Sequence, residues 1–378
     1  MKKLLFISTR SPYSGRYSGD VIRSLKIIET LRKKYQVDII YLCKKKEPKN
    51  KLNIFSFEYP NYFMKILYCF SFFLKFEPVQ FGLFYSGEMK KFIEENSNNY
   101  DILFFHHIRS TQYLPKNFYG KKILDMGDLY SENYLQTFKY LNIFNPLRYI
   151  YFLESLMVKK IEKRIFNLFD KIFLFSKNET EKLKRKYKTK IIQIDESVNV
   201  INKKVSFSFN CSRVLFVGNL NYLPNILACK DFIKNILPIL IKKIPSIKFT
   251  IIGNIKKFDK LFLSKHKNVE ILGPKKNLLK YVKSSFCGLA NLNIATGIQV
   301  KVLTYMSYGL PAICSNKVSV NFDKNVITYN SNSELAKKIL KLKSDKKLWN
   351  KYSKKSYLFI QKFKWKKVSL KYFKNFNF

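Results

Sequence analysis

One stretch of the chain combines a glycine loop, the start of a helix and a lysine. Residues 290–315 read ANLNIATGIQVKVLTYMSYGLPAICS, in which an apolar strand leads into a loop that contains Gly297. A helix is expected from about Ile298 to Tyr308, with Gly309 at its end and Pro311 opening the next strand. The start of this helix would therefore face any ligand bound beyond the preceding strand.

The expected chemistry of this stretch is the binding of a diphosphate. Backbone N–H groups at Ile298, Gln299 and Val300 would be free at the helix start, and together with the helix dipole they favour an anion. Lys301 would add a positive charge at the same point. One glycine before a helix is a weak motif, however, and an ordinary strand–helix corner with a solvated lysine fits the spacing equally well.

Further polar residues follow a strand in the first half of the chain. His106, His107 and Arg109 come directly after the apolar run 101–105. Side chains alternate between the two faces of a strand, so we expect only one histidine at the binding edge, and we favour His107 with Arg109 on the same face. His107 could orient a hydroxyl group or bind phosphate, or it could equally be a packed core histidine.

Two aspartates follow the next apolar run, in the sequence DMGD at residues 125–128. Asp128 is the carboxylate best placed for catalysis or for orienting a substrate. Asp125 is read as a turn residue or a helix cap.

Strands in the second half of the chain end at glycines. Gly218, Gly253 and Gly273 each close an apolar run, and Gly218 leaves room for the close approach of a phosphate or a sugar. Ligands of open parallel sheets bind beyond the carboxyl ends of the strands, so these loops are expected to form a binding wall.

The glycine–lysine stretch resembles a motif of the bacterial glycosyltransferase family 4 enzymes, which have the GT-B fold. The family motif is G-I-Q-N-K-V-L-E-A-M-A-x-G-x-P-V-V, and residues 297–313 of this chain read GIQVKVLTYMSYGLPAI. Residues 214–238 (VLFVGNLNYLPNILACKDFIKNILP) and 271–281 (ILGPKKNLLKY) are similar to two further family segments.

In the first half the resemblance is patchier. Residues 11–12, the pair Gly19-Asp20 with Arg23, and residues 125–131 resemble the acceptor-side loops of the family. The sequence FKW at residues 363–365 resembles the family segment that crosses back to the first domain. The resemblance thus spans most of the chain.

The resemblance implies a glycosyltransferase that moves a sugar from a UDP- or GDP-sugar, with no bound metal and no other cofactor, to a glycan or lipid-linked acceptor. Retention of the anomeric configuration would make a dedicated base unnecessary, with Asp128 and His107 positioning the acceptor. The products would be lipopolysaccharide, capsule or exopolysaccharide. The implied donor-binding residues are Gly218, Asn219, Gly273, Gly297, Ile298, Gln299, Lys301 and Thr304. The implied acceptor-binding residues are Gly19, Asp20, Arg23 and Arg109, and the implied catalytic residues are Asp128, His107 and Lys301.

Several positions depart from the family pattern. Thr304 and Thr296 stand where family members carry glutamates, and Asn219 together with the turn 222–225 replaces the usual Arg and Lys. The donor contacts are therefore expected to be thinner than normal. Either the enzyme handles its donor differently, or it is a divergent, slow or inactive member.

The order of the elements predicts an α/β protein with two Rossmann-like, doubly wound parallel-sheet domains facing a cleft. We expect an N-terminal acceptor domain over residues 1–200, a donor domain over 211–350, and a helix over 351–378 that crosses back to the first domain. The boundary is placed in the polar, aperiodic stretch 195–211. The glycine-rich turn 14–20 is expected to lead from the first strand into a helix.

Two helical segments, 147–168 and 62–76, carry residues that packing in a hydrophobic core does not require. Glu154 and Glu162 lie in the otherwise apolar and basic helix 147–168, where ion pairs with Lys159 or Arg164 are favoured over a contact across the cleft. The apolar run 62–76 is shorter than the ~20 residues of a spanning helix, so we expect either a helix at a membrane surface or one packed on the first sheet.

The charge of the chain is extreme. Its 378 residues include 71 Lys and Arg against 26 Asp and Glu, a net charge of +45, which is typical of proteins that bind polyanions. Only 9 of the basic residues are Arg, and Lys is spread along the whole chain, as a genome rich in A and T would produce. We therefore expect no nucleic-acid partner, although an anionic membrane surface remains a candidate partner.

The location expected from the sequence is cytoplasmic, with or without peripheral attachment to the inner face of the plasma membrane. Six dispersed cysteines indicate a reduced compartment, and the first residues form a strand rather than a signal peptide. The alternative function is that of an inactive, basic GT-B-scaffold protein that binds membrane or nucleic acid. A phosphorylase-like or epimerase-like enzyme on this fold is disfavoured, because neither a cofactor-linking lysine nor an epimerase carboxylate pattern is found.

Overall fold

The computed structural model of the chain describes residues 1–14, 19–45, 53–201 and 204–376. It divides them into two units, of which the first comprises Met1–Asp195 with Ser369–Phe378 and the second Glu196–Val368. Residues 15–18 of the predicted glycine-rich turn lie outside the described residues.

The first unit contains a seven-stranded sheet in the order β3-β2-β1-β4-β5-β6-β7, and every pair of neighbours is parallel. The central strands β1, β4 and β5 are apolar runs that are buried on both faces, as a sheet covered by helices on both sides requires. The strands are β1 (Lys3–Ser8), β2 (Gln36–Cys43), β3 (Ile54–Glu58), β4 (Ile102–His106), β5 (Lys121–Gly127), β6 (Lys171–Leu174) and β7 (Ile191–Gln193).

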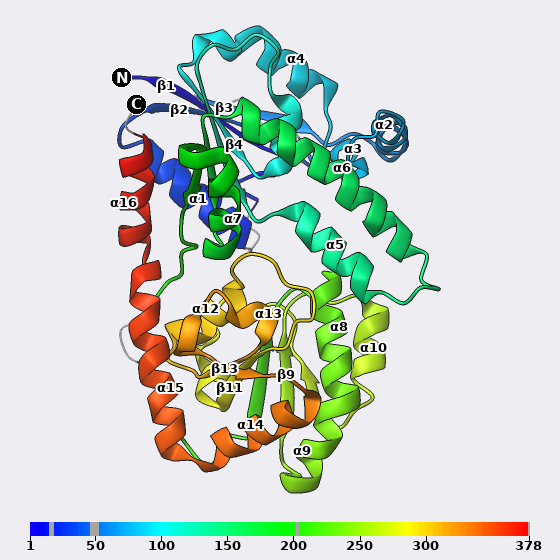
Figure 1. Cartoon of the computed structure of the whole chain (residues 1–378), viewed down its shortest axis with the longest axis vertical. Coiled ribbons are helices and arrows are strands. Elements are labelled where there is room, and N and C mark those ends of the chain that lie inside the picture. Colours follow the sequence, from blue (N-terminus) through cyan, green and yellow to red (C-terminus); the bar gives the residue numbers. More distant parts are fainter. Residues whose placement is uncertain (15–18, 46–52, 202–203, 377–378) are drawn as a thin grey trace. The chain divides into compact units, whose positions relative to one another are not determined.

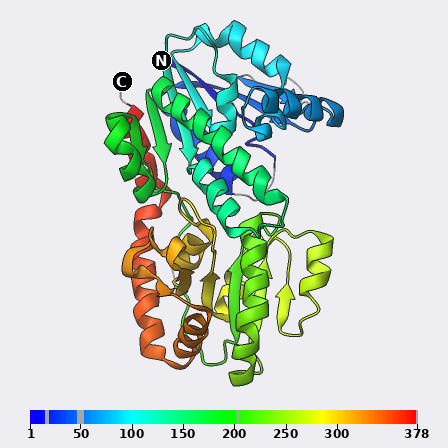
Figure 2. The same cartoon turned by 45° about the vertical axis from the view of Figure 1, so that its right-hand side comes forward.

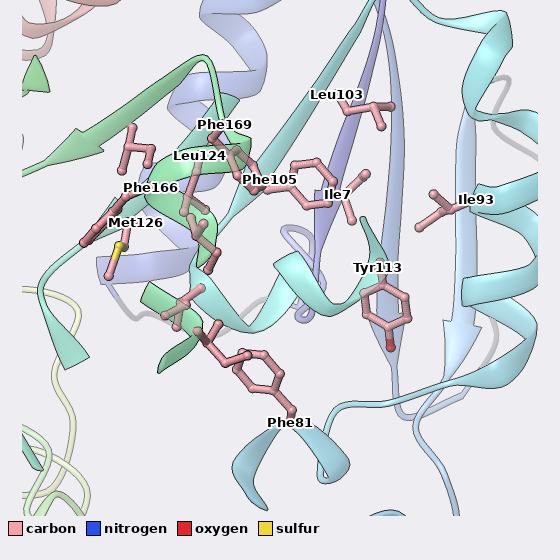
Figure 3. Packing of buried hydrophobic residues seen from close by; sticks show 14 of the residues in the cluster. Ile7, Phe81, Ile93, Leu103, Phe105, Tyr113, Leu124, Met126, Phe166 and Phe169 are labelled. Atoms are coloured by element: carbon pink, nitrogen blue, oxygen red, sulfur yellow. The ribbon is translucent and has the colours of Figure 1, made fainter. Parts of the chain in front are cut away.

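Helices cover both faces of this sheet (Figures 1 and 2). They are α1 (Gly19–Leu31), α2 (Tyr62–Leu74), α3 (Val79–Gly82), α4 (Gly87–Asn96), α5 (Tyr130–Tyr140), α6 (Leu147–Leu168), α7 (Lys177–Tyr187) and α16 (Trp365–Phe376). Figure 3 shows one core layer, in which Phe81 of α3, Ile93 of α4 and Phe166 of α6 meet the strand residues Ile7 and Phe105.

The opposite face of the sheet is closed by α1 and α16. The ring of Phe376 lies 5.8 Å from that of Phe104, and the ring of Tyr372 lies 5.2 Å from that of Phe173. These contacts explain why the C-terminal part of the last helix groups with the first unit although it follows the second along the chain.

A buried ion pair ties α1, β5 and α16 together. Arg23 donates from Nε to Asp125 Oδ2 and from Nη2 to Asp125 Oδ1, both at 3.0 Å. Tyr372 donates to the same carboxylate at 2.9 Å. Burial alone would raise the pKa of Asp125, but Arg23 and His106 hold that pKa well below its usual range. The carboxylate is therefore ionised in the core.

The second unit contains a six-stranded sheet in the order β10-β9-β8-β11-β12-β13, again with parallel neighbours throughout. Its strands are β8 (Arg213–Val217), β9 (Lys248–Ile252), β10 (Val269–Ile271), β11 (Ser285–Ala290), β12 (Ala312–Ser315) and β13 (Ile327–Tyr329). Gly288 of β11 lies under the ring of Tyr305, where an added Cβ would come within 2.3 Å of the ring.

The helices of the second unit include an interruption. A π-helical turn, Phe232–Ile236, stands between α8 and α9. Pro238 follows this turn and donates no backbone hydrogen bond, which accounts for the break. The helices are α8 (Leu223–Asp231), α9 (Leu237–Lys243), α10 (Lys257–Leu263), α11 (Leu279–Lys283), α12 (Val300–Ser307), α13 (Asn316–Ser319), α14 (Asn332–Ser344) and α15 (Lys346–Phe359).

The predicted fold class is confirmed, since both units are doubly wound parallel sheets with Rossmann-type strand order. The predicted return segment, residues 351–378, contains the point at which the chain passes from the second unit to the first. Residues 351–368 stay with the second unit, where Trp349 at the start of α15 is 1% exposed and donates to the carbonyl of Phe286. Only Ser369–Phe378 groups with the first unit.

Removing the charge that neutralises Asp125 should destabilise the first unit. In Arg23→Leu the carboxylate stays buried without its bidentate partner, so we expect the free energy of unfolding at pH 7 to fall by about 3–5 kcal/mol. Tyr372→Phe removes the hydroxyl that donates to Asp125 and accepts from Arg23, and the loss of these two hydrogen bonds should cost about 2 kcal/mol. Because the pKa of Asp125 is depressed, the stabilisation is present above pH ~4 and is lost as the pH falls.

Urea unfolding followed by circular dichroism measures these changes. Leu370→Ala, on the exposed side of α16, is the control and should change the free energy of unfolding by less than about 0.5 kcal/mol. Equal, small effects of all three substitutions would contradict a stabilising role for the buried pair.

Candidate functional site

The strand order of the second sheet reverses between β8 and β11, and the predicted donor residues lie at that edge. Chain connections leave the sheet in opposite directions at such a point, which opens a crevice beyond the carboxyl ends of the strands. Gly218 comes directly after β8 and Gly253 directly after β9, whereas one residue separates Gly273 from the end of β10.

Close backbone contacts hold these glycine loops together. A Cβ added to Gly253, whose φ is +154°, would lie 1.8 Å from the carbonyl oxygen of Gly218, so only glycine fits there. The N–H of Gly253 donates to the carbonyl of Gly273 at 3.1 Å. The ends of β8, β9 and β10 thus form one continuous surface. We call it the glycine wall and define it by the loops at Gly218, Gly253 and Gly273.

Asn225, near the start of α8, joins this wall to Lys301. Its Nδ2 donates to the carbonyl of Asn219 at 2.8 Å, and its Oδ1 accepts from Lys301 Nζ at 2.5 Å. Gly218 packs against the same side chain, since a Cβ there would lie 3.0 Å from Asn225 Nδ2. Asn225 was not among the donor-binding residues predicted from the sequence, although the P-N pair at the helix start belongs to the segment on which the resemblance rests.

Lys301 is a buried cation. It is 8% exposed, and its Nζ lies 4.3 Å from the centre of the Phe216 ring. Burial lowers the pKa of Lys301 to about 7, an effect that Cys229 and Cys314 oppose in part. An anion bound beside Nζ would favour the protonated form and raise this pKa, so the group can supply a full positive charge to a phosphate.

The helix that follows begins later than the sequence predicted. α12 starts at Val300 with Gln299 as its N-cap residue, and the carbonyl of Gln299 accepts from the N–H groups of Val302 and Leu303. Ile298 therefore lies in the loop, and Lys301 is the second helical residue. The N–H groups of the first turn are those of Val300 and Lys301 rather than of Ile298 and Gln299.

Side chains brace the loop before α12. Gln299 Nε2 donates to the carbonyl of Thr296 at 3.0 Å, and Asn321 Nδ2 donates to the carbonyl of Gly297 at 2.7 Å. Gly297 has a φ of +63°, which glycine adopts without strain. Thr304 turns its hydroxyl to the carbonyl of Val300, so it is one helical turn along from the loop.

The first sheet reverses its order between β1 and β4, and the predicted acceptor residues gather at that edge. Arg10, which follows β1, pairs with Asp20 of α1 at 2.6 Å. Arg109 donates from Nε to Gln80 Oε1 at 2.8 Å and lies 4.8 Å from the centre of the Phe84 ring. Gly19 is the first residue of α1, and nothing lies within 4 Å of the position of a Cβ there.

The two histidines do not point to opposite faces. Their ring centres lie only 4.1 Å apart, because β4 ends at His106 and His107 leaves the strand with a φ of +66°. His106 is 2% exposed, and its Nδ1 lies 3.2 Å from Asp125 Oδ2. Burial, more than the neighbouring His106, lowers the pKa of His107 well below its usual value, so this ring is neutral at pH 7.

The loop that carries Asp128 is held by two buried glutamates. Glu179 accepts from the N–H of Leu129 at 3.1 Å. Glu162 accepts from the N–H of Ser131 at 3.1 Å and from its hydroxyl at 2.5 Å. The ion pairs expected for Glu162 are absent among the described residues, since Arg164 pairs instead with Glu77. Glu162 therefore positions the segment between β5 and α5.

Glu154 also differs from the expected ion pair. It accepts from the backbone N–H of Gln80 at 3.3 Å and from its Nε2 at 3.4 Å. Since Gln80 also accepts from Arg109, Glu154 and Arg109 hold the same amide side chain.

Each unit brings most of its predicted residues to one edge. In the second unit, Gly218, Asn219 and Gly273 lie in the glycine wall, and Lys301 contacts this wall through Asn225. The remaining predicted residues belong to the segment 297–304, which contains Lys301. In the first, Asp20 and Arg109 lie near enough to His107 for their charges to act on it. Arg23 is 2% exposed and engaged with Asp125, so the structure places it inside the unit.

Asp125 was read as a turn residue, yet it is the centre of the buried pair. No sequence signal links it to Tyr372, which lies 247 residues away.

No group of three or more His, Cys, Asp or Glu that could hold a metal ion occurs in the described part of the chain.

Most of the second unit matches a known family model. Residues 211–345 match the family model described as glycosyl transferases group 1. A Klebsiella pneumoniae protein, described as an uncharacterized 44.6 kDa protein in the cps region, is 27% identical over 281 residues. The match covers 68% of this chain and 66% of that protein, just under two thirds of its length.

Solved structures share the fold over the whole chain. The structure of TarM has a TM-score of 0.67 at 12% identity, and the match covers 100% of this chain and 99% of TarM. Anabaena HepE, in complex with UDP and glucose, has a TM-score of 0.66 at 11% identity, with 99% of both chains covered. WaaB, described as a lipopolysaccharide outer core galactosyltransferase, has a TM-score of 0.54 at 12% identity, with 99% of this chain and 98% of WaaB covered. The likeness shows the GT-B fold that the resemblance implied.

Glu162 makes a testable contribution to the pH dependence of stability. Burial raises the pKa of its carboxyl to about 7, so between about pH 5 and pH 7 the native state holds a proton that the unfolded chain has released. This group therefore makes stability fall as the pH rises. In Glu162→Gln we expect the wild-type minus variant difference in the free energy of unfolding to decrease by on the order of 2 kcal/mol from pH 5 to pH 8.

Urea unfolding at the two pH values checks this, with the exposed Glu88→Gln as the matched control. A difference that stays constant across the range would contradict the buried, protonated carboxyl.

Proposed function

We propose that this protein is a glycosyltransferase that moves a sugar from a nucleotide-sugar donor, a UDP- or GDP-sugar, to a glycan or lipid-linked acceptor of a cell-surface polysaccharide. The observation that carries the proposal is the buried Lys301–Asn225 contact at the glycine wall of the second unit. The matched residues 211–345 contain this whole arrangement.

The donor diphosphate is proposed to lie between the glycine wall and the start of α12. A phosphate beside Lys301 would have a cation, the N–H groups of Val300 and Lys301, and the dipole of an eight-residue helix. These groups would stabilise the negative charge that grows on the leaving diphosphate without a metal ion. The complex of HepE with UDP and glucose supports a donor of this kind.

The proposed reaction retains the anomeric configuration. The bond between the anomeric carbon and the diphosphate oxygen breaks, a bond to the acceptor oxygen forms on the same face, and the acceptor proton passes to the leaving phosphate. The protein then needs no base of its own. His107 is neutral and Asp128 lies in the segment before α5 that Glu162 holds, so both are proposed to position the acceptor hydroxyl.

The proposed setting is the synthesis of lipopolysaccharide, capsule or exopolysaccharide at the cytoplasmic face of the membrane. The relative from a cps region, together with WaaB among the structural neighbours, supports this setting. The family 4 branch is proposed on the motif at residues 297–313. The competing proposal is an inactive scaffold, which the threonines at positions 296 and 304 favour and the preserved Lys301 opposes.

A panel of nucleotide sugars tests the donor site. We expect UDP-glucose or GDP-mannose, and not ADP-glucose, to raise the melting temperature of the wild type by several degrees, since ligand binding to the native state stabilises it. Lys301→Ala should abolish this shift in a thermal-shift assay with EDTA present. Lys243→Ala, an exposed lysine in the last turn of α9, is the matched control and should keep it.

No shift with any nucleotide sugar, together with salt-sensitive binding to DNA or anionic lipid, would overturn the enzyme proposal in favour of the basic scaffold.

The acceptor edge is tested by turnover. His107→Asn keeps a residue that tolerates the positive φ, and Asp128→Asn keeps the shape of the side chain. Each should lower kcat/KM for the acceptor by about tenfold or more while leaving donor binding unchanged, because positioning contributes mainly to the chemical step. The exposed His266→Asn is the control. Full activity of both variants would remove these residues from the mechanism.

A further inference from the structure

Helix α2 exposes an apolar face that no part of the described chain covers. None of its 13 residues is buried, although the helix is one of the most apolar segments of the sequence. Tyr62 is 80% exposed, Phe63 67% and Leu74 68%. We define the α2 face as the exposed side chains Tyr62, Phe63, Ile66, Phe70, Phe73 and Leu74. Their spacing places them on one side of a helix.

The other side of α2 is fixed to the first unit, so the orientation of the α2 face is set. A Cβ added to Gly82 of α3 would lie 2.5 Å from the backbone nitrogen of Cys69, which shows how closely the two helices approach. The rings of Tyr68 and Phe72 lie 4.9 Å and 5.8 Å from that of Tyr85. Figures 1 and 2 show α2 at an edge of the first unit.

Positive charge surrounds this face. Residues 62–76 contain two lysines, Lys65 and Lys75, and no acidic residue. Lys160 of α6 brings its Nζ to 5.6 Å from the centre of the Phe76 ring. The acidic residue that follows, Glu77, lies 3.4 Å from Arg164. The chemistry is that of an apolar surface with a basic rim.

We propose that α2 docks the first unit onto an anionic lipid bilayer, with the α2 face among the upper acyl chains and its lysines at the lipid phosphates. A helix of 13 residues is about 20 Å long, too short to cross a hydrocarbon core of about 30 Å, and it lies in the interface plane. No helix in the described part of the chain is long and apolar enough to cross a membrane.

A bilayer fits this face better than a protein partner. Protein interfaces need complementary pockets for large side chains and are depleted in lysine. Acyl chains accommodate protruding aromatic rings of any shape, and lysine side chains reach from an apolar surface to the phosphate level. The proposal is independent of nucleotide binding, since every residue it uses lies away from the glycine wall in sequence and belongs to the first unit.

Cosedimentation of the full chain with vesicles tests the proposal. The vesicles contain equimolar phosphatidylglycerol and phosphatidylcholine, and the buffer holds about 0.3 M NaCl to weaken attraction due to net charge alone. Phe63→Ser with Phe70→Ser should lower the partition coefficient by about tenfold or more. The matched control replaces two other exposed aromatic residues, Tyr119 and Phe258, with serine and should bind as the wild type does.

Fluorescence quenching locates the contact without depending on affinity. Phe63→Trp and Tyr119→Trp each add one indole at an exposed position to the two tryptophans of the chain. Brominated acyl chains should quench the emission of the variant with Trp at position 63 and leave that of the other nearly unchanged.

Equal binding of the wild type and the serine variant, or equal quenching of the two tryptophan variants, would overturn the proposal. A wild-type dimer that the Phe63→Ser and Phe70→Ser substitutions dissociate, without vesicle binding, would also overturn it, because the α2 face would then contact a second copy of the chain. Binding that depends on the α2 face and on the anionic lipid supports it.

Discussion

The buried ammonium group of Lys301 constrains the rest of the proposed donor site. A lysine taken out of water loses hydration that one amide oxygen and one aromatic ring replace only in part, and its pKa falls to about 7. A diphosphate at the start of α12 would reverse that shift. In the proposed site, the glycine wall, the Asn225 side chain and the braced loop before α12 would hold this one cation beside an anion.

The first unit uses buried charge in a different way. There the guanidinium of Arg23 meets the carboxylate of Asp125 in two hydrogen bonds, and Tyr372 adds a third donor. The two charges of this cluster, on Arg23 and Asp125, neutralise each other, so the cluster fixes α1, β5 and α16 to one another. The two sheets thus share a strand order, but the buried charges of the first unit stabilise its fold, whereas the buried lysine of the second is proposed to bind a ligand.

Much of the architecture could be predicted from the sequence, because short apolar runs that end at glycine, such as the one before Gly218, indicate buried parallel strands. The edge strands β3 and β7 and the π-helical turn at Phe232–Ile236 were missed, since short or interrupted elements leave little periodicity. The stacked histidines could not be foreseen, because a positive φ at His107 is decided by tertiary packing. Likewise, the partners of Glu162 and Asp125 lie 31 and 247 residues away. The Lys301 position was found because a motif marked it.

The central claim is that Lys301 binds the diphosphate of a nucleotide sugar without a metal. Phosphorus NMR of UDP-glucose and GDP-mannose, titrated with the full chain in EDTA, measures this at the atoms concerned. If Lys301 binds the diphosphate, both diphosphate resonances of one of these donors shift to saturation with the wild type and stay unshifted with Lys301→Ala. Shifts of equal size in the two proteins, or none with either donor, would contradict it.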